Sequence, residues 1–284
     1  MLSKNLKILI VGLGLLGGSY AKKLSSEGYH VRAITRDPET IRYALEHKMI
    51  ESGTIEIDSE LIADSDLIIF ALYPTVFIRW IEENGHLIKS GTVITDVTGV
   101  KGSVVDRVQS ALPDGIEFIS AHPMAGRESS GIEFADDTIF KAANYIVVPT
   151  EKNTPEGIRL CRELGEALGF AKISELSVEE HDRMIAFLSQ LTHCIAVSLM
   201  CTDDNPDLIK YTGDSFRDLT RIANINDEMW SELFLLNRDA LLQEMDRFKS
   251  SFDELYDTIK NNKREEMRTL MRTSSERRRK FNKK

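Results

Sequence analysis

The chain has 284 residues, of which 42% are hydrophobic and 29% are charged. This much apolar material supplies one large or two moderate cores, which excludes a disordered or collagen-like chain. The formal net charge of -9 argues against a general binder of nucleic acid or of anionic membranes, because such partners would be repelled. Residues 263–284 carry ten Lys or Arg and three Glu, and we interpret this basic end as a solvated helix.

The cysteines and the N-terminus indicate in which cell compartment the protein is expected. Three cysteines, Cys161, Cys194 and Cys201, form no CxxC pair, and their odd number does not suggest a disulfide framework. The start of the chain imitates a secretory signal, but cleavage near Ala21 would remove a glycine-rich turn that the fold requires. No uninterrupted apolar run approaches the roughly 18 residues of a membrane span. We therefore expect a cytoplasmic protein.

Residues 7 to about 174 alternate short apolar runs with longer amphipathic ones, which is the pattern of a parallel sheet with crossover helices. Strands are predicted at 7–11, 30–34, 67–71, 92–95, 117–120, 145–148 and 171–174. Asp37-Pro38 opens the second helix, and Thr154-Pro155-Glu156 opens a helix that stops at Gly169. The predicted fold class is α/β, with a Rossmann-type doubly wound sheet at the N-terminal end.

After residue 174 the apolar residues recur at spacings of three and four, which predicts an all-helical C-terminal domain. Helices are expected near 178–201, 207–221, 227–260 and 263–280, with a break at residues 203–206. The density of Phe, Leu and Met in this half predicts that part of its surface packs against a second copy, forming a homodimer.

A glycine-rich run follows the first predicted strand. Gly12-Leu13-Gly14-Leu15-Leu16-Gly17 matches GxGxxG, and a helical stretch from 19 to 27 comes directly after it. In this context the first glycine permits a tight turn, the second lets the backbone approach a pyrophosphate, and the third lets helix and strand pack closely. We therefore expect these six residues to bind a dinucleotide, which makes 1–174 a dinucleotide-binding domain and 175–284 a substrate and dimerisation domain.

The end of the second strand selects the cofactor. An acidic residue at this point binds the ribose hydroxyls of NAD, whereas this chain has Thr35 followed by Arg36. A hydroxyl and a guanidinium suit a 2′-phosphate, so NADP is the favoured cofactor and NAD the alternative. Asp37 could bind ribose instead, although its place before Pro38 is also that of a helix cap.

Two polar segments, 96–101 and 121–128, each follow a predicted strand directly. The carboxyl ends of such strands line the crevice where a nicotinamide lies in a doubly wound sheet. His122 is suited to remove a proton there, because the ordinary pKa of histidine is close to neutral. No metal-ligand spacing is apparent in the sequence, and no metal is expected.

The sequence resembles the prephenate/arogenate dehydrogenases of tyrosine biosynthesis over nearly its whole length. The resemblance is carried by the N-terminal GxGxxG, by DVxxVK at 96–101 and by HPMAGxE at 122–128. The helical half adds His181-Asp182, the segment Ser189 to His193, FRDxTRIA at 216–223, and Met229-Trp230.

The resemblance implies an oxidative decarboxylation of prephenate to 4-hydroxyphenylpyruvate, with the conversion of arogenate to tyrosine as the alternative. It implies that His122 accepts the proton of the ring hydroxyl and that Arg221 binds a substrate carboxylate. His193 and Glu128 are expected near the substrate. The same resemblance places Asp96 at the cofactor, and Thr98, Gly99 and Gln190 at the substrate.

Two departures from the family pattern leave the substrate preference open. Gly99 stands where the family usually has Ser, so an orienting hydrogen bond is either absent or supplied by Thr98 or water. Gln190 and Thr192 replace the first His and the Pro of the family's SHLPH. One alternative function is that of a dehydrogenase acting on 3-hydroxy acids, but the HPMAG and TRIA segments argue against it. A second alternative is a non-catalytic sensor or scaffold that binds NADP.

Overall fold

The computed structural model describes residues 2–126 and 129–281. The chain divides into two compact units, Met1–Asn237 and Arg238–Lys284, and each is described by itself.

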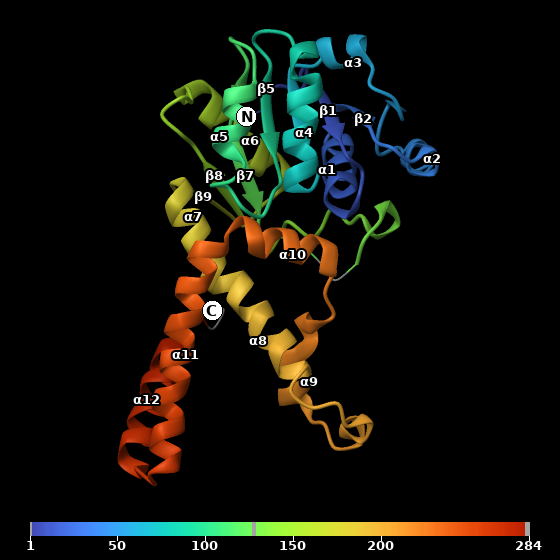
Figure 1. The fold of residues 1–284 in the computed structure, drawn as a ribbon. Helices are drawn as coiled ribbons and strands as arrows, with labels where there is room; N and C mark the ends of the chain where they lie inside the picture. The colour runs from blue at the N-terminus through green and yellow to red at the C-terminus, as the bar shows by residue number, and fades with distance from the viewer. Residues whose placement is uncertain (1, 127–128, 282–284) are drawn as a thin grey trace. The chain divides into compact units, whose positions relative to one another are not determined.

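The first unit contains a six-stranded parallel sheet in the order β3-β2-β1-β4-β5-β6 (Figure 1). Its strands are β1 (Lys7–Val11), β2 (His30–Ile34), β3 (Ser52–Thr54), β4 (Leu67–Phe70), β5 (Val93–Asp96) and β6 (Glu117–Phe118). The helices between them are α1 (Leu15–Ser26), α2 (Pro38–Glu46), α3 (Ser59–Ala63), α4 (Pro74–Asn84) and α5 (Val105–Ala111). This strand order is that of dinucleotide-binding folds and confirms the predicted class. Strand β3, Ser-Gly-Thr, has no apolar run, and the sequence analysis missed it.

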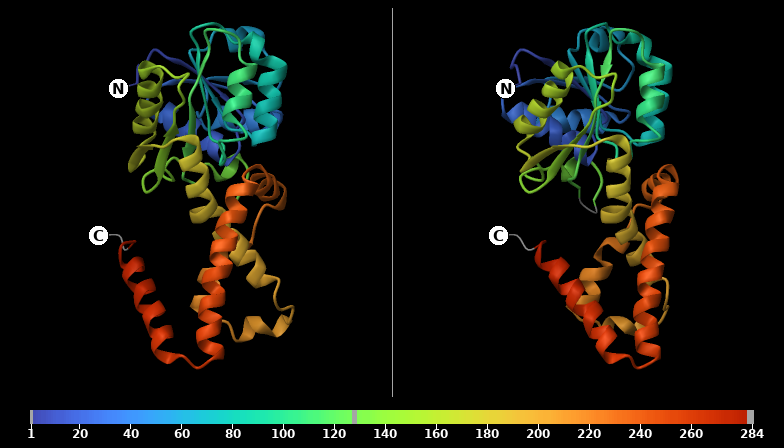
Figure 2. Two further views of the ribbon diagram at one scale, coloured as in Figure 1. Left: turned by 60° about the vertical axis from the view of Figure 1, so that its left-hand side comes forward. Right: turned by 90° about the vertical axis from the view of Figure 1, so that its left-hand side faces the viewer.

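Both faces of this sheet are buried, as Figure 2 shows by the helices on either side. Side chains alternate along β1: Ile8 and Ile10 pack in the cluster that contains Leu24 of α1, whereas Leu9 and Val11 pack in the other cluster, with α4. Strands buried on both faces read as continuous apolar runs, which is why the sequence located them.

A second sheet, of three strands, follows the first along the chain. It consists of β7 (Ser120–Pro123), β8 (Asn144–Val148) and β9 (Lys172–Glu175), with α6 (Pro155–Leu168) before β9. The sequence predicted one strand at 117–120, and that prediction was incomplete. The chain stays extended past Ile119, whose N–H donates to Ile94 of the first sheet at 3.0 Å, and then pairs antiparallel with β8. His122 lies on β7, opposite Ile146.

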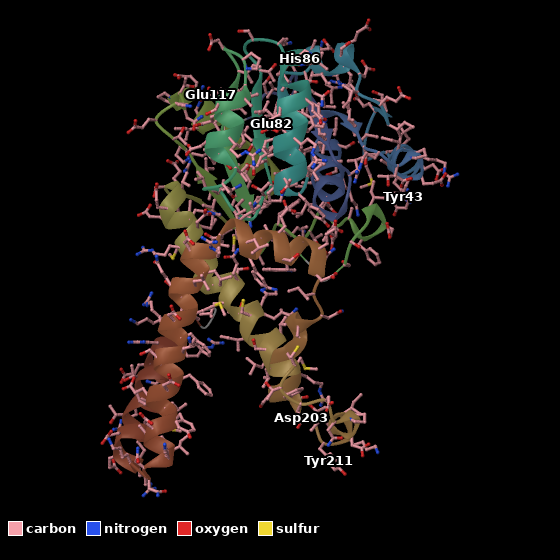
Figure 3. The ribbon with its side chains drawn as sticks, in the orientation of Figure 1. Tyr43, Glu82, His86, Glu117, Asp203 and Tyr211 are labelled. Atoms are coloured by element: carbon pink, nitrogen blue, oxygen red, sulfur yellow. The ribbon has the colours of Figure 1, made fainter. Side chains whose placement is uncertain are left out.

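The rest of the first unit is helical. Helix α7 (Val178–Ile185), a π-helical turn (Ala186–Gln190) and α8 (Leu191–Met200) follow without a break. The predicted helix at 207–221 was wrong, because a 3-10 turn (Pro206–Lys210) and α9 (Asp214–Thr220) take its place, with Gly213 as the N-cap of α9. Figure 3 shows Asp203 and Tyr211 on the loop between α8 and α9. Helix α10 (Asp227–Leu236) ends the unit.

The second unit is a helical hairpin of α11 (Arg238–Lys260) and α12 (Arg264–Arg279). The turn between the helices places Asn262 at a φ of 52°, in the left-handed region that asparagine tolerates better than most residues. The single helix predicted at 227–260 was wrong, because the helical backbone breaks at Asn237, where φ is -117° and ψ is 27°.

In the described part of the chain, the span Val178–Met200 has the length and composition of a membrane-crossing helix, with a hydropathy of 1.3. This is weak evidence, because helices in the core of a folded domain pass the same test. The span also carries His181 and Gln190, whose polar side chains are buried and hydrogen-bonded to protein groups.

Candidate active site

The loop between β1 and α1 is shaped by its three motif glycines. Gly12 has a φ of 95°, and a Cβ placed there would lie 2.5 Å from the carbonyl oxygen of Ala71. A Cβ on Gly17 would lie 1.9 Å from the carbonyl oxygen of Gly12, so only glycine lets α1 start this close to β1. A Cβ on Gly14 would meet open space. The amides at the start of α1 are therefore accessible to an anionic group, which is what a dinucleotide requires.

The side chains of this loop take different positions. Leu13 is buried, Leu15 and Leu16 are half-buried, and Leu16 packs against the core. Thr35 and Arg36 follow β2, where Thr35 is half-buried and Arg36 is exposed. Asp37 accepts hydrogen bonds from the backbone of Glu39 and Thr40, so the helix-cap alternative for this residue was correct.

Asp96 lies inside the protein, where five donors surround it. Its Oδ1 accepts hydrogen bonds from the Ser120 hydroxyl at 2.7 Å and the Ala121 amide at 3.0 Å. Its Oδ2 accepts from the amide and hydroxyl of Thr98 and lies 2.8 Å from Nζ of Lys101. Both side chains of the ion pair are 0% exposed. The sequence analysis expected Asp96 at the cofactor, but its carboxylate is engaged by these protein donors.

Lys101 completes this buried cluster. Its ammonium donates to the carbonyl of Ala121 at 2.7 Å and to the Thr98 hydroxyl at 3.2 Å. Burial lowers the pKa of Lys101, and the carboxylate of Asp96 opposes that shift. The cluster fastens the loop after β5 to the start of β7, directly beside His122. Thr98, expected at the substrate, is held within this cluster by its hydroxyl.

His122 is the first of three hydrogen-bonded side chains. Its Nδ1 lies 2.9 Å from Nε2 of His181 on α7, and Nδ1 of His181 lies 2.7 Å from Oδ1 of Asp182. Burial lowers the pKa of His122 well below its ordinary value, and His181 and Lys101 act in the same direction. Burial also lowers the pKa of His181, although the hydrogen bond that its Nδ1–H donates to Asp182 opposes this. His122 is therefore neutral near pH 7, as a proton acceptor must be.

Asp182 holds this chain of side chains to the loop after β5. Its Oδ1 accepts from the amide of Lys101 at 2.9 Å, and its Oδ2 accepts from the amide of Gly102 at 2.7 Å. The sequence analysis quoted His181-Asp182 only as a point of resemblance and gave the pair no role. The separation of 59 residues between His122 and His181 leaves no local signal for their contact.

Gly99 faces the ring of His122. A Cβ at this position would lie 3.9 Å from Cε1 of His122 and 3.5 Å from Cδ2 of Leu233 on α10, which are ordinary contact distances. The structure therefore leaves room for a serine here. The glycine leaves that space beside the ring open.

Helix α10 is tied to the rest of the unit at its middle and at its C-terminal end. At the start of α4, the amide and hydroxyl of Thr75 donate to the carboxylate of Glu232 (Figure 1 shows α10 near this end of α4). At the C-terminal end, Asn237 donates to the carbonyl of Asp182 at 2.9 Å and to Oε1 of Gln190 at 2.8 Å. Gln190 donates to the carbonyl of Leu233 at 2.8 Å. Gln190, expected at the substrate, is thus buried between α10 and the π-helical turn.

His193 and Arg221 lie on adjoining elements. His193 on α8 stacks on Trp230 of α10, with ring centroids 3.7 Å apart, and its Nδ1 donates to the carbonyl of Ser189 at 2.9 Å. Arg221 is exposed and begins the 3-10 turn Arg221–Ala223, which packs against α8. Glu128 lies outside the described residues.

Among the residues that the structure describes, no group of three His, Cys, Asp or Glu side chains is placed to hold a metal ion. The unit contains an open glycine loop at the start of α1, a neutral, half-buried histidine at the end of β7 and a stacked histidine-tryptophan pair. The fold and these groups define a Rossmann-type dinucleotide-dependent oxidoreductase.

Comparison with known proteins specifies the family. Residues 20–174 match the family model described as prephenate dehydrogenase, nucleotide-binding domain, and residues 177–273 match prephenate dehydrogenase, dimerization domain. The prephenate dehydrogenase of Bacillus subtilis is 29% identical over 95% of this chain and 74% of its own length. The chain belongs to the prephenate dehydrogenase family and is an NAD(P)-dependent dehydrogenase.

Two solved structures share the fold over nearly the whole chain. Prephenate dehydrogenase from Aquifex aeolicus, in complex with hydroxyphenyl propionate and NAD+, is 28% identical with a TM-score of 0.89, and the match covers 98% of each chain. The arogenate dehydrogenase of Synechocystis is 26% identical with a TM-score of 0.84, and the match covers 98% of this chain and 100% of that one.

Proposed function

We propose that this protein oxidises and decarboxylates prephenate to 4-hydroxyphenylpyruvate in tyrosine biosynthesis. The observation that carries the proposal is the neutral, half-buried ring of His122, beside which Gly99 leaves room for no more than a small side chain. Membership of the prephenate dehydrogenase family supports the substrate class. Conversion of arogenate to tyrosine is the second candidate, because the Synechocystis relative bears that name.

In this mechanism the nicotinamide, when bound, supplies the hydride acceptor. The residues from Gly12 to Gly17 would hold its pyrophosphate through backbone amides, at the positive end of the α1 dipole. His122 takes the proton of the ring hydroxyl as the carbinol carbon loses hydride, and the ring carboxylate leaves as carbon dioxide. Aromatisation of the ring makes this step irreversible, so the protein only has to align the reactants and accept one proton.

Arg221 and His193 form the substrate end of this proposal. A guanidinium makes two parallel hydrogen bonds to a carboxylate, and Arg221 begins a turn packed against the helix that carries His193. Arg221→Ala is expected to raise KM with little change in kcat, and an unchanged KM would remove Arg221 from the carboxylate site. We propose that Glu128 is a further substrate-binding residue, and that Asp96, Thr98 and Gln190 position the site through their protein partners.

For the cofactor we propose NADP, with NAD as the alternative. The exposed guanidinium of Arg36 beside Thr35 supports a 2′-phosphate contact. Arg36→Ala is expected to weaken NADP binding about tenfold or more, because a charge-assisted hydrogen bond contributes about 1.5–3 kcal/mol, while NAD binding changes little. Equal effects on the two cofactors would contradict this assignment.

The experiment that tests the function is an initial-rate assay at the absorbance band of reduced nicotinamide, crossing prephenate and arogenate with NAD and NADP. Turnover with prephenate and not with arogenate supports the first candidate, and the reverse supports the second. Absence of turnover in all four combinations, with cofactor binding retained, would favour a non-catalytic nucleotide sensor or scaffold.

We further propose a cytoplasmic homodimer in which residues 1–174 bind the dinucleotide and residues 175–284 provide substrate contacts and the dimer interface. The description of the matched dimerization domain supports this assembly. Large apolar side chains are exposed in the helical half, among them Phe187, Leu188, Leu219, Leu235 and Phe252. Sedimentation that shows a monomer at micromolar concentration would contradict the dimer.

A further inference from the structure

The geometry points to a positioning role for His181 and Asp182: we propose that they hold His122 in the tautomer whose Nε2 is unprotonated, and that His181 receives the Nδ1 proton of His122 during turnover. This inference rests on the proposed function of His122 as proton acceptor. It adds two residues that contact neither substrate nor cofactor but act through the ring of His122.

The tautomers follow from the order of the hydrogen bonds. An ionised carboxylate only accepts, so the Asp182 oxygen 2.7 Å from Nδ1 of His181 requires a proton on that nitrogen. A neutral His181 then has an unprotonated Nε2, which accepts a hydrogen bond. The nitrogen 2.9 Å away, Nδ1 of His122, must therefore carry the proton of that bond. A neutral His122 is left with its lone pair on Nε2.

The same contacts provide a path for charge. When Nε2 of His122 takes the hydroxyl proton of the substrate, Nδ1 can release its proton to Nε2 of His181, so His122 stays neutral. His181 becomes an imidazolium whose Nδ1–H is already bonded to the Asp182 carboxylate. The three side chains together gain one proton. The resulting positive charge lies on His181, next to the buried carboxylate of Asp182. It does not lie on His122, beside a nicotinamide that would itself be cationic before hydride transfer.

The surrounding charges favour this arrangement. Four ionisable groups act on His181: Asp182, Lys101, Asp96 and the ring of His122. Asp182 raises the pKa of His181 most, through its hydrogen bond, whereas the charge of Lys101 lowers this pKa and the carboxylate of Asp96, 2.8 Å from Lys101, offsets part of that effect. Its oxygens are fixed by the amides of Lys101 and Gly102, so the acceptor at the end of the path cannot rotate away. Burial keeps the pKa of His181 below its ordinary value at rest, so the imidazolium forms only when a proton arrives.

A first test reads the tautomer directly. Selective 15N labelling of histidine distinguishes protonated from unprotonated ring nitrogens by chemical shift, and the resonances of His122 are assigned by their loss in His122→Asn. We expect His122 in the Nδ1–H form near pH 7.5. An Nε2–H form in the wild-type protein would overturn the inference. This measurement needs no turnover, so it decides the role of His181 even if the assay finds no activity with any substrate.

A second test separates hydrogen bonding from proton uptake. In His181→Gln the amide oxygen can still accept from Nδ1 of His122 but cannot take up its proton, whereas His181→Ala removes both. We expect kcat to fall about 10-fold to 100-fold in the Gln variant, which is less than the loss of about 10²–10⁴ that removal of a general base causes. In the Ala variant kcat should fall further, toward that range. KM and cofactor Kd should stay within about twofold.

The matched control is His86→Gln, which changes an exposed histidine in the 3-10 turn Gly85–Leu87 that follows α4 (Figure 3). It should leave both kcat and the His122 resonances unchanged. A purely structural role for His181 would lower Tm in the Ala variant while kcat of the folded enzyme stayed at the wild-type value, and that result would overturn the proposal.

Discussion

The buried ion pair of Asp96 and Lys101 predicts a large loss of stability in Lys101→Met. The substitution keeps a similar apolar stem but removes an ammonium that lies 2.8 Å from Asp96 and 2.7 Å from the carbonyl of Ala121. Four hydrogen-bond donors to Asp96 remain in the variant, but the positive charge that balances its carboxylate is lost. Removing one partner of a buried ion pair costs about 3–5 kcal/mol in the free energy of unfolding. The carbonyl of Ala121, left without its donor, accounts for about 1–3 kcal/mol of that loss.

Urea unfolding followed by far-UV circular dichroism measures this loss, with Lys89→Met as the matched control. Lys89 pairs with Asp66 at 3.4 Å, and both side chains are well exposed, so its removal should change the free energy of unfolding by less than about 1 kcal/mol. If Lys101→Met also fell within 1 kcal/mol of the wild type, the reasoning that this cluster fastens the loop after β5 to β7 would be refuted.

Three other perturbations have defined outcomes. Gly17→Ala places a Cβ 1.9 Å from the carbonyl of Gly12, so we expect a loss of about 1–3 kcal/mol in stability and weaker binding in a fluorescence titration with reduced cofactor; unchanged affinity would contradict the role of the loop. Gly99→Ser meets only ordinary contacts, so its Tm should match the wild type and its kcat should be retained; a large fall in Tm would show that the space is not open. Because the pKa values of His122 and His181 are lowered in the folded state, the unfolded chain takes up protons first as pH falls, and stability should be lost below about pH 6.5 by up to about 1.4 kcal/mol per unit for each histidine. Urea midpoints between pH 7.5 and 5.5 should show a flatter slope in His122→Asn, and an unchanged slope would refute the assignment.

The nucleotide end of the site could be predicted because its determinants are local. The GxGxxG spacing, the preceding apolar run and the helix that follows all lie within 20 residues, and the glycines have the constraints that the motif requires. The helix-cap alternative for Asp37 was also local, since Pro38 marks the first turn. Strands buried on both faces were found for the same reason.

The substrate end was predicted less completely because its contacts are long-range. Asp96 was expected at the cofactor and Gln190 at the substrate, and the protein groups from β7 and α10 that bond to their side chains were not predicted. The chain from His122 to Asp182 joins a strand to a helix, and no periodicity encodes such a contact. The break at Asn237 was missed because its cause, two hydrogen bonds to Asp182 and Gln190, is also tertiary.

The π-helical turn at Ala186–Gln190 has a consequence for how this half of the site tolerates insertions and deletions. A π-helical turn closes its hydrogen bonds over five residues instead of four, so it holds one residue more than a regular turn for about the same rotation. Loss of one residue here would restore regular α-helical bonding and leave the direction of α8 relative to α7 nearly unchanged, with His193 still facing Trp230. A deletion between this turn and His193, in the regular part of α8, has no extra residue to remove and would turn His193 away from Trp230 by about 100°. The π-helical turn is therefore the place where this helix can lose a residue while its stacked pair is kept.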